Sequence, residues 1–199
     1  ATNGAGTPAS DDVEIFVDTV APGTPGVPVA GNLGDDGNWY INTLWPTFTW
    51  DASVDQEPSS GIRDYTFQFG TGPKPDPDDG PDPDTWAGML FEETGIPAGG
   101  TAVEQWTTNE SIASWGVVAG EAYLARVKAY DNAGNESLWT DSSIIYDPDP
   151  PTTPGTPTTT SPTNDSTPTW TWGGSTDAIS GVDLYHIQIR RTGSLDWDV

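Results

Sequence analysis

The chain has 199 residues, 30 acidic side chains against 6 basic ones, a formal net charge of −24, one histidine and no cysteine. These counts argue against nucleic acid or an anionic membrane surface as a partner, because phosphate binding requires clustered Lys and Arg. They exclude disulfides and thiol chemistry, and a single histidine gives little basis for a zinc site or a His-based catalytic triad. We therefore do not expect an enzyme, and without a run of 18 apolar residues we expect no membrane-spanning segment.

The patterning predicts an all-β protein. No stretch keeps a helical apolar period for three turns, whereas short alternating segments recur between Gly, Pro and Asp. An aromatic content of 11% can build thin cores in spite of the low hydrophobic content. In chain order, the predicted strands are 14–18, 48–50, 65–69, 103–107, 112–115, 123–129, 144–146 and 185–189.

An internal repeat organises these strands. The sequence Pro-Thr-Phe-Thr-Trp at 46–50 returns as Pro-Thr-Trp-Thr-Trp at 168–172, an offset of 122 residues. The linker before it returns with an offset of 129, and Ser60-Gly61 with the following Tyr65 returns with an offset of 120. The order is kept while the offset shrinks, so the second copy has shorter loops.

The repeat divides the chain into three parts. Residues 1–18 correspond to the last strand of a preceding repeat and the start of a linker. Residues 19–147 form a complete β-sandwich repeat, with a long insertion at 71–116. Residues 148–199 hold only the opening strands of a further repeat, so we expect the missing strands either beyond this sequence or from a neighbouring molecule.

The joint order of motifs resembles the fibronectin type III and immunoglobulin-like tandem repeats of bacterial extracellular surface proteins. The motifs are P-T-F-T-W at 46–50, S-G-I at 60–62, and the strand at 123–129 followed by Asp-Asn-Ala-Gly-Asn at 131–135. The resemblance covers residues 13–70 and 117–192, implies an antiparallel β-sandwich, and fails at about 71–116. It implies structural roles, with Tyr123 at the place of a tyrosine corner, for Trp50, Tyr65, Tyr123, Trp172 and Tyr185.

Calcium is the predicted cofactor. In a sandwich of this topology the entering linker and two loops lie at one pole, and Ca²⁺ takes six to eight oxygen ligands from flexible loops. The predicted ligands at the first junction are Asp18, Asp51, Asp55, Asp131, Asn132, Asn135 and Glu136. Those at the second junction are Asp147, Asp149 and Asp177. The alternative is that these residues cap turns without a metal.

Two further features have structural and functional interpretations. The alternating Pro and Asp residues at 73–84 predict an extended, solvated loop rather than a calcium loop, because calcium loops need sharp turns that converge oxygens. Trp86, Trp106 and Trp115 could form a platform for glycans, but packing of the insertion against the sandwich is favoured.

These observations predict a structural, non-catalytic segment of an extracellular repeat protein of bacteria or archaea, such as an adhesin stalk, sheath or filament. Its partners would be neighbouring repeats or copies of itself, with glycans or another cell-surface protein as further partners. One alternative is a carbohydrate-binding accessory module of a secreted polysaccharide-degrading enzyme. Another is a self-assembling subunit, in which residues 13–17 complete the unfinished sandwich of a neighbour.

Overall fold

The computed structural model describes residues 15–72, 86–160 and 164–189, and the predicted Pro/Asp loop at 73–84 lies outside them. The all-β prediction is confirmed, since the described residues contain eight named strands and no α-helix. The strands are β1 (Asn32–Leu33), β2 (Trp39–Ile41), β3 (Thr47–Asp51), β4 (Ile62–Gly70), β5 (Met89–Pro97), β6 (Val103–Thr107), β7 (Ala122–Asp131) and β8 (Thr140–Tyr146).

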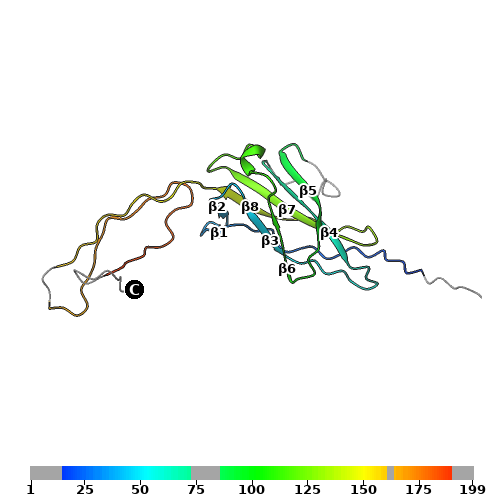
Figure 1. Cartoon of the computed structure of the whole chain (residues 1–199), viewed down its shortest axis with the longest axis horizontal. Coiled ribbons are helices and arrows are strands. Elements are labelled where there is room, and N and C mark those ends of the chain that lie inside the picture. Colours follow the sequence, from blue (N-terminus) through cyan, green and yellow to red (C-terminus); the bar gives the residue numbers. More distant parts are fainter. Residues whose placement is uncertain (1–14, 73–85, 161–163, 190–199) are drawn as a thin grey trace, which may run out of the picture.

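The strands form two sheets that pack on each other (Figure 1). The larger sheet has the order β1-β2-β8-β7-β4-β5, and the smaller one pairs β3 with β6. Neighbouring strands are antiparallel, with one exception: β2 runs parallel to β8. The chain enters at one end of this sandwich and leaves at the opposite end.

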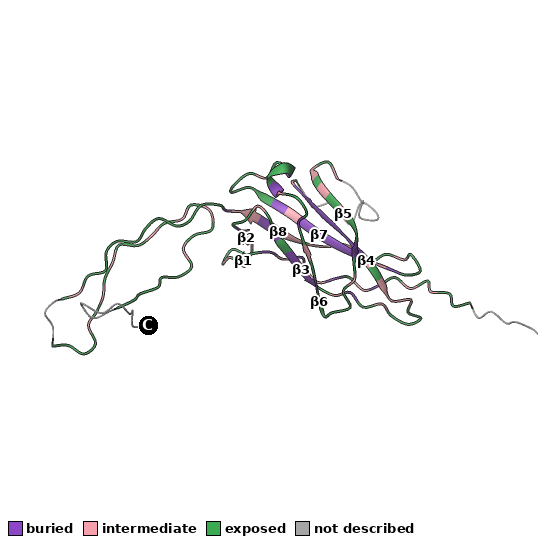
Figure 2. Ribbon diagram, viewed as in Figure 1, coloured by how far each residue is buried: buried purple, intermediate pink, exposed green. Residues whose placement is uncertain are grey.

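Alternating aromatic residues fill the space between the sheets, as the sequence predicts. Phe48 and Trp50 of β3 face Tyr65, Phe67 and Phe69 of β4, and each is at most 2% exposed. Their rings touch directly, with 4.6 Å between the ring centroids of Phe48 and Phe67. The buried residues accordingly follow the middle of the facing strands (Figure 2).

Three predicted strands are not formed, and three observed strands were not predicted. The described residues 15–18 of the predicted strand 14–18 are not in a strand, and neither are 112–115 or 185–189. Residues Ile112–Trp115 form the 3₁₀ helix η2, which begins where the Ser111 side chain accepts a hydrogen bond from the Ala113 N–H. It ends at Gly116, whose φ of 81° is the left-handed conformation that glycine adopts without strain. Strands β1, β2 and β5 were missed.

The outer face of the larger sheet carries alternating aromatic and cationic side chains, which we name the cation–aromatic ladder. Its members, in stacking order, are Trp86, Arg126, Trp139, Lys128, Tyr130 and Arg63. The Arg126 guanidinium lies 4.4 Å from the centroid of one indole and 4.2 Å from that of the other. As a result, two cations on the outward side of β7 are only 1% and 2% exposed.

The segment after β8 extends away from the sandwich (Figure 1). The described part of residues 148–189 contains an antiparallel bridge between Thr158 and Thr171, but no named strand. The strand predicted at 185–189 is therefore not formed as a named element. Its apolar residues are open to solvent, since Tyr185 is 41% and Ile187 43% exposed, whereas their counterparts Tyr65 and Phe67 are fully buried.

Candidate metal centre at the linker pole

Three carboxylates from distant parts of the chain meet where the linker enters the sandwich. Asp18 belongs to the linker, Asp55 to the loop between β3 and β4, and Asp131 to the end of β7. Each offers one carboxylate oxygen, and these three oxygens lie within 4.8 Å of one another. We name these residues the linker-pole triad, and each is positioned by hydrogen bonds from nearby backbone or side-chain groups.

Asp131 is held by the turn that follows it. Its side chain is fully buried, and its Oδ1 accepts hydrogen bonds from the N–H groups of Gly134 at 2.7 Å and Asn135 at 2.8 Å. Its Oδ2 accepts from the Asn135 side-chain amide, also at 2.7 Å. The same amide approaches the carbonyl oxygens of Asp18 and Val20 at 3.3 Å, so the turn is tied to the linker.

Asp18 is held across the junction. Its Oδ1 accepts a hydrogen bond from the Val20 N–H at 3.0 Å, and its Oδ2 accepts from the Ser60 N–H at 2.8 Å. The bond from Val20, followed by those from Ser60, lowers the pKa of the Asp18 carboxyl from its ordinary value. The group is thus kept in the ionised form that a cation requires.

Asp55 contains the unusual atom of the triad. Its Oδ2 accepts hydrogen bonds from the Gly61 N–H at 2.7 Å and from the Ser59 hydroxyl at 3.1 Å. Its Oδ1 is buried and has no hydrogen-bond partner. Because a buried, unpaired carboxylate oxygen is costly, this atom calls for a positive charge or a donor.

Two of the cations in the described segments form ion pairs with carboxylates outside the triad. Lys128 pairs with Glu136 at 2.6 Å, and Arg63 pairs with Asp64 at 2.8 Å. A set of three carboxylates with carbonyl oxygens nearby is instead the ligand chemistry that a hard divalent cation such as Ca²⁺ prefers. The residues present therefore fit the predicted ion.

The other four residues predicted at this junction lie outside the triad. Asp51 ends β3 and is exposed, and Glu136 is directed to Lys128 of the ladder. The Asn132 side-chain amide donates to the carbonyl oxygens of Ser60 and Gly61. Asn132 and Asn135 thus fix the loops around the triad by donating hydrogen bonds.

The second junction repeats this hydrogen-bond pattern. Asp147 Oδ1 accepts from the Asp149 N–H at 3.1 Å, and its Oδ2 accepts from the Ser180 N–H at 3.1 Å, as Asp18 does with Val20 and Ser60. Asp177 Oδ1 accepts from the Gly181 N–H at 3.1 Å, as Asp55 Oδ2 does with Gly61. Hydrogen bonds from the backbone N–H groups, with that of Ile179 first, also lower the pKa of the Asp177 carboxyl. Among the described residues, however, no third carboxylate joins Asp147 and Asp177 as Asp131 joins Asp18 and Asp55.

The correspondence extends beyond the carboxylates. The Ser53 N–H donates to the Tyr65 hydroxyl at 3.0 Å, and the Ser175 N–H donates to the Tyr185 hydroxyl at 2.7 Å. The paired ring contacts also agree: Trp50 with Tyr65 at 5.5 Å and 65°, and Trp172 with Tyr185 at 5.7 Å and 61°. Three backbone hydrogen bonds also recur, each from an N–H to a carbonyl oxygen. The bond from Gly23 to Val54 corresponds to that from Thr152 to Thr176. The bonds from Gly26 to Asp51 and from Val29 to Thr49 correspond to those from Gly155 to Gly173 and from Thr158 to Thr171.

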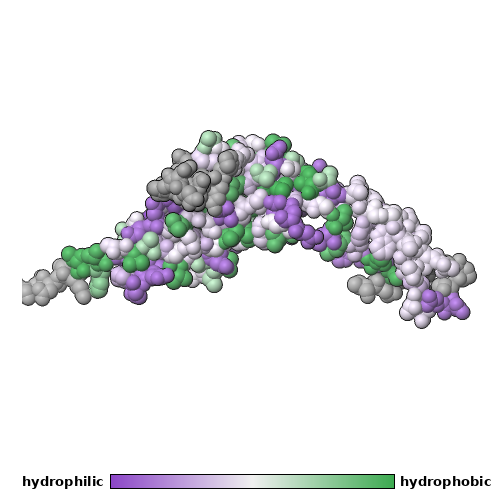
Figure 3. All heavy atoms as spheres, turned by 180° about the vertical axis from the view of Figure 1, so that it is seen from behind, coloured by the Kyte–Doolittle hydropathy of each residue, from purple (hydrophilic) through white to green (hydrophobic). Residues whose placement is uncertain are grey.

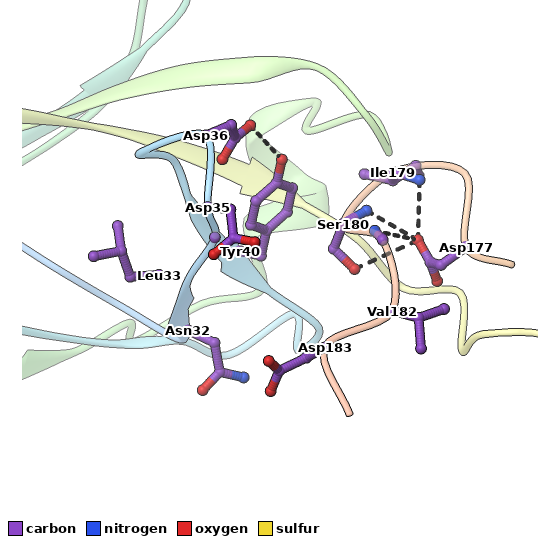
Figure 4. Close-up of a pocket in the computed structure, with 12 residues that line it drawn as sticks. Asn32, Leu33, Asp35, Asp36, Tyr40, Asp177, Ile179, Ser180, Val182 and Asp183 are labelled. Carbon is purple, nitrogen blue, oxygen red and sulfur yellow. Dashed lines mark hydrogen bonds between the residues drawn. The ribbon is translucent and has the colours of Figure 1, made fainter. Parts of the chain in front are cut away.

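An acidic cleft of about 720 Å³ separates the sandwich from the second junction (Figure 4). Asp36 and Tyr40 line one side, where the Tyr40 hydroxyl donates to Asp36 at 2.7 Å. Asp177 and Asp183 line the other side. The carboxylates of Asp36 and Asp177 already accept hydrogen bonds from their own turns, so the cleft has the character of a solvated junction.

The tryptophans considered for glycan binding are used for packing. Trp115 is buried, Trp106 stacks with Phe91 at 5.6 Å in the core, and Trp86 covers Arg126. Trp45, at 53% exposure, is the most open tryptophan among the exposed large apolar side chains. Trp86, Trp106 and Trp115 thus each make packing contacts with other side chains of the sandwich.

Comparison with known proteins found no matching family model and no matching curated protein. Within the described residues, no helix has the length and apolar character needed to cross a bilayer.

Proposed function

We propose that this chain is a structural, non-catalytic segment of an extracellular repeat protein, built from fibronectin type III or immunoglobulin-like sandwiches whose junctions bind Ca²⁺. One observation carries the proposal: the carboxylate of Asp18 in the linker meets that of Asp55 in a loop and that of Asp131 at the end of β7, and one oxygen of Asp55 is buried and unpaired. The hydrogen bonds that recur at the second junction support a serial arrangement of such units.

Calcium at the linker-pole triad would connect three elements that are otherwise joined by a few hydrogen bonds. It would tie Asp18 of the linker to Asp55 and Asp131, and so limit the angle between the linker and the sandwich. Pro22, which lies between Asp18 and the segment that runs beside β3, acts in the same direction, because proline fixes the backbone φ angle and stiffens a connection. A stalk or filament of such units would be an extended, stiff spacer.

A calcium titration of the full chain tests the metal site. Since an ion that binds only the folded state stabilises it, roughly 2.7 kcal/mol is expected at a hundredfold excess over Kd, seen as a rise in the melting temperature. Asp55→Asn should abolish most of this rise. Asp51→Asn is the matched control, because it makes the same charge change at an exposed acid outside the triad. Equal calcium shifts in both variants, or none in the native chain, would refute the site.

The alternative functions have less support. A carbohydrate-binding module is disfavoured because the three candidate tryptophans, Trp86, Trp106 and Trp115, pack against other side chains of the sandwich. The topology also disfavours the model in which residues 13–17 complete the sandwich of a neighbouring molecule. These residues correspond in the repeat to β8, which pairs with β2 on one side and with β7 on the other. A strand donated to residues 148–189 would need counterparts of β2 and β7 to pair with. The described part of this segment contains no strand that could serve as either.

A further inference from the structure

The segment that leaves the sandwich is rich in threonine and proline. Residues 151–160 read Pro-Thr-Thr-Pro-Gly-Thr-Pro-Thr-Thr-Thr, and they run along the arm that extends away from the sandwich (Figure 1). This arm lies on the right in Figure 3, where it is largely pale, the colour of intermediate hydropathy. A composition of this kind supplies few apolar side chains for a core, and it is typical of extended stalks that carry sugars on their hydroxyl groups.

The repeat shows that threonine stands here at positions that are apolar in the complete copy. Backbone hydrogen bonds at three equivalent positions hold the two segments along the same path. Residues 22–31 of the complete copy read Pro-Gly-Thr-Pro-Gly-Val-Pro-Val-Ala-Gly. Residues 151–160 have threonine at the equivalents of Val27, Val29 and Ala30, so the same backbone path presents hydroxyl groups in place of apolar side chains.

Three of these threonines have exposed hydroxyl groups that are not in use. Thr153, Thr156 and Thr160 are exposed, and their hydroxyls make no hydrogen bond within the described residues. Thr158 is different, because its hydroxyl lies 3.2 Å from that of Thr171 and 3.3 Å from the Thr171 carbonyl oxygen. The first three hydroxyls are therefore the ones that an enzyme could modify without breaking a contact.

The exposure of these three positions does not result from the lack of named strands around them. Their equivalents in the complete sandwich are also exposed, namely Thr24, Val27 and Gly31. By contrast, Thr159 corresponds to Ala30, which is only 4% exposed. A sandwich completed around residues 148–189 would cover Thr159 and would still leave the three free hydroxyls in solvent.

The neighbouring prolines keep the backbone open at two of the three positions. Thr153 directly precedes Pro154, and Thr156 directly precedes Pro157. A residue before proline is restricted to extended conformations, so neither threonine can withdraw into a helical turn. An extended, exposed backbone gives a modifying enzyme access to the side-chain hydroxyl.

We propose that Thr153, Thr156 and Thr160 are acceptor sites for O-linked glycans. In the reaction, the threonine Oγ1 attacks the anomeric carbon of a hexose or N-acetylhexosamine that is activated as a nucleoside diphosphate sugar or a lipid-linked sugar. The bond from that carbon to the phosphate oxygen breaks, the phosphate group leaves with the electron pair, and the hydroxyl proton passes to a base of the transferase. A neutral sugar suits this chain better than a phosphate, which would add negative charge to a formal net charge of −24.

The glycan sites go beyond the proposed spacer function, because they involve neither the linker-pole triad nor calcium. Mass mapping of the protein purified from its own cells tests them. Cleavage before aspartate releases peptide 149–164, which contains the three sites, and peptide 36–50 as a matched control. In the control peptide, Thr43 and Thr47 are exposed, but their hydroxyls already form hydrogen bonds.

Peptide 149–164 should be heavier than its sequence mass by whole hexose or N-acetylhexosamine units, whereas peptide 36–50 should have its sequence mass. Mild alkali should release the sugars by β-elimination and leave dehydrated threonine at the three sites, which locates them. An unmodified native peptide 149–164 would overturn the proposal. So would a phosphate increment, dehydrated threonine at Thr158 or Thr159 only, or a mass that is removed solely by an amidase acting at Asn164.

Variants produced in the same cells separate the hydroxyl from the surrounding sequence. The triple change Thr153→Ala, Thr156→Ala and Thr160→Ala should lose the added mass, while the same triple change to serine should keep it because serine retains the hydroxyl. Added mass that persists in the alanine variant would refute the assignment. The native map needs no variant, and a failed calcium titration would refute the metal site without changing this map.

Discussion

Replacing Arg126 by Met should destabilise the sandwich far more than an ordinary charge removal at the surface. The guanidinium is 1% exposed and lies between the rings of Trp86 and Trp139. Its Nε donates to the Gln68 side-chain oxygen at 2.7 Å, and Gln68 is itself fully buried. Methionine has a similar length and fits between the rings, so the change removes the charge and the hydrogen bond without opening a large cavity.

The size of the effect follows from these contacts. Two cation–aromatic contacts contribute about 0.5 to 2 kcal/mol each, and a buried amide oxygen that loses its charged donor costs roughly 1 to 3 kcal/mol. The expected loss is then about 2 to 7 kcal/mol, a substantial part of the roughly 5 to 15 kcal/mol by which domains are stable. A double change that also replaces Gln68 by Leu should recover part of the loss, because the side-chain oxygen that loses its charged donor is removed as well.

Urea unfolding followed by tryptophan fluorescence measures this loss, with the midpoint shifted and the slope unchanged. The matched control is Arg63→Met, which makes the same charge change at the open end of the ladder. The Arg63 side chain is 45% exposed and pairs with its neighbour Asp64, so its loss should cost at most about 1 kcal/mol. Similar losses for the two variants would refute the ladder as a source of stability.

Three further results are expected. The hydrogen bond from Val20, followed by those from Ser60, lowers the pKa of the Asp18 carboxyl, so the stability that this group contributes is present above its ordinary value of 3.8 and is lost as the pH falls through the folded value. The stability advantage over Asp18→Asn should therefore shrink as the pH falls below 3.8, and an advantage that does not change with pH would contradict this role. Tyr65→Phe removes the acceptor of the buried Ser53 N–H and should cost about 1 to 3 kcal/mol in urea unfolding; an unchanged midpoint would contradict that role. Gly88→Ala should lower the melting temperature, because its Cβ would lie 1.8 Å from a backbone oxygen, and a native-like melting temperature would show that this contact is absent.

The strands that the sequence predicts are those with clean alternation against a buried face. Residues 48–50, 65–69 and 123–129 alternate in this way, and they lie in β3, β4 and β7. Strands β1 and β2 are two and three residues long, which is too short to show a period. The apolar run at 112–115 suits a strand or a helical turn equally, and the Ser111 cap and Gly116 decide for the helix.

The candidate site was predictable to the level of loops, but not of individual side chains. The repeat places the linker and two loops at one pole, and the convergence of Asp18, Asp55 and Asp131 agrees with this. Which acids converge depends on local hydrogen bonds, such as the turn that directs Asn135 to the linker and the cation that takes Glu136. The cation–aromatic ladder also has a signal in the sequence. Arg126, Lys128 and Tyr130 alternate along one strand and therefore share its outward side.

The positions of the charges explain how so acidic a chain keeps a folded sheet. Three of its six basic residues, Arg63, Arg126 and Lys128, lie in described segments, and all three belong to the ladder. Those cations cover the outer face of the larger sheet, and Arg63 and Lys128 form ion pairs with Asp64 and Glu136, which lie outside the linker-pole triad. A unit built in this way depends on solvent or on a bound cation at its poles. Calcium bound at the linker-pole triad should therefore raise both the stability of the folded unit and the stiffness of its junction.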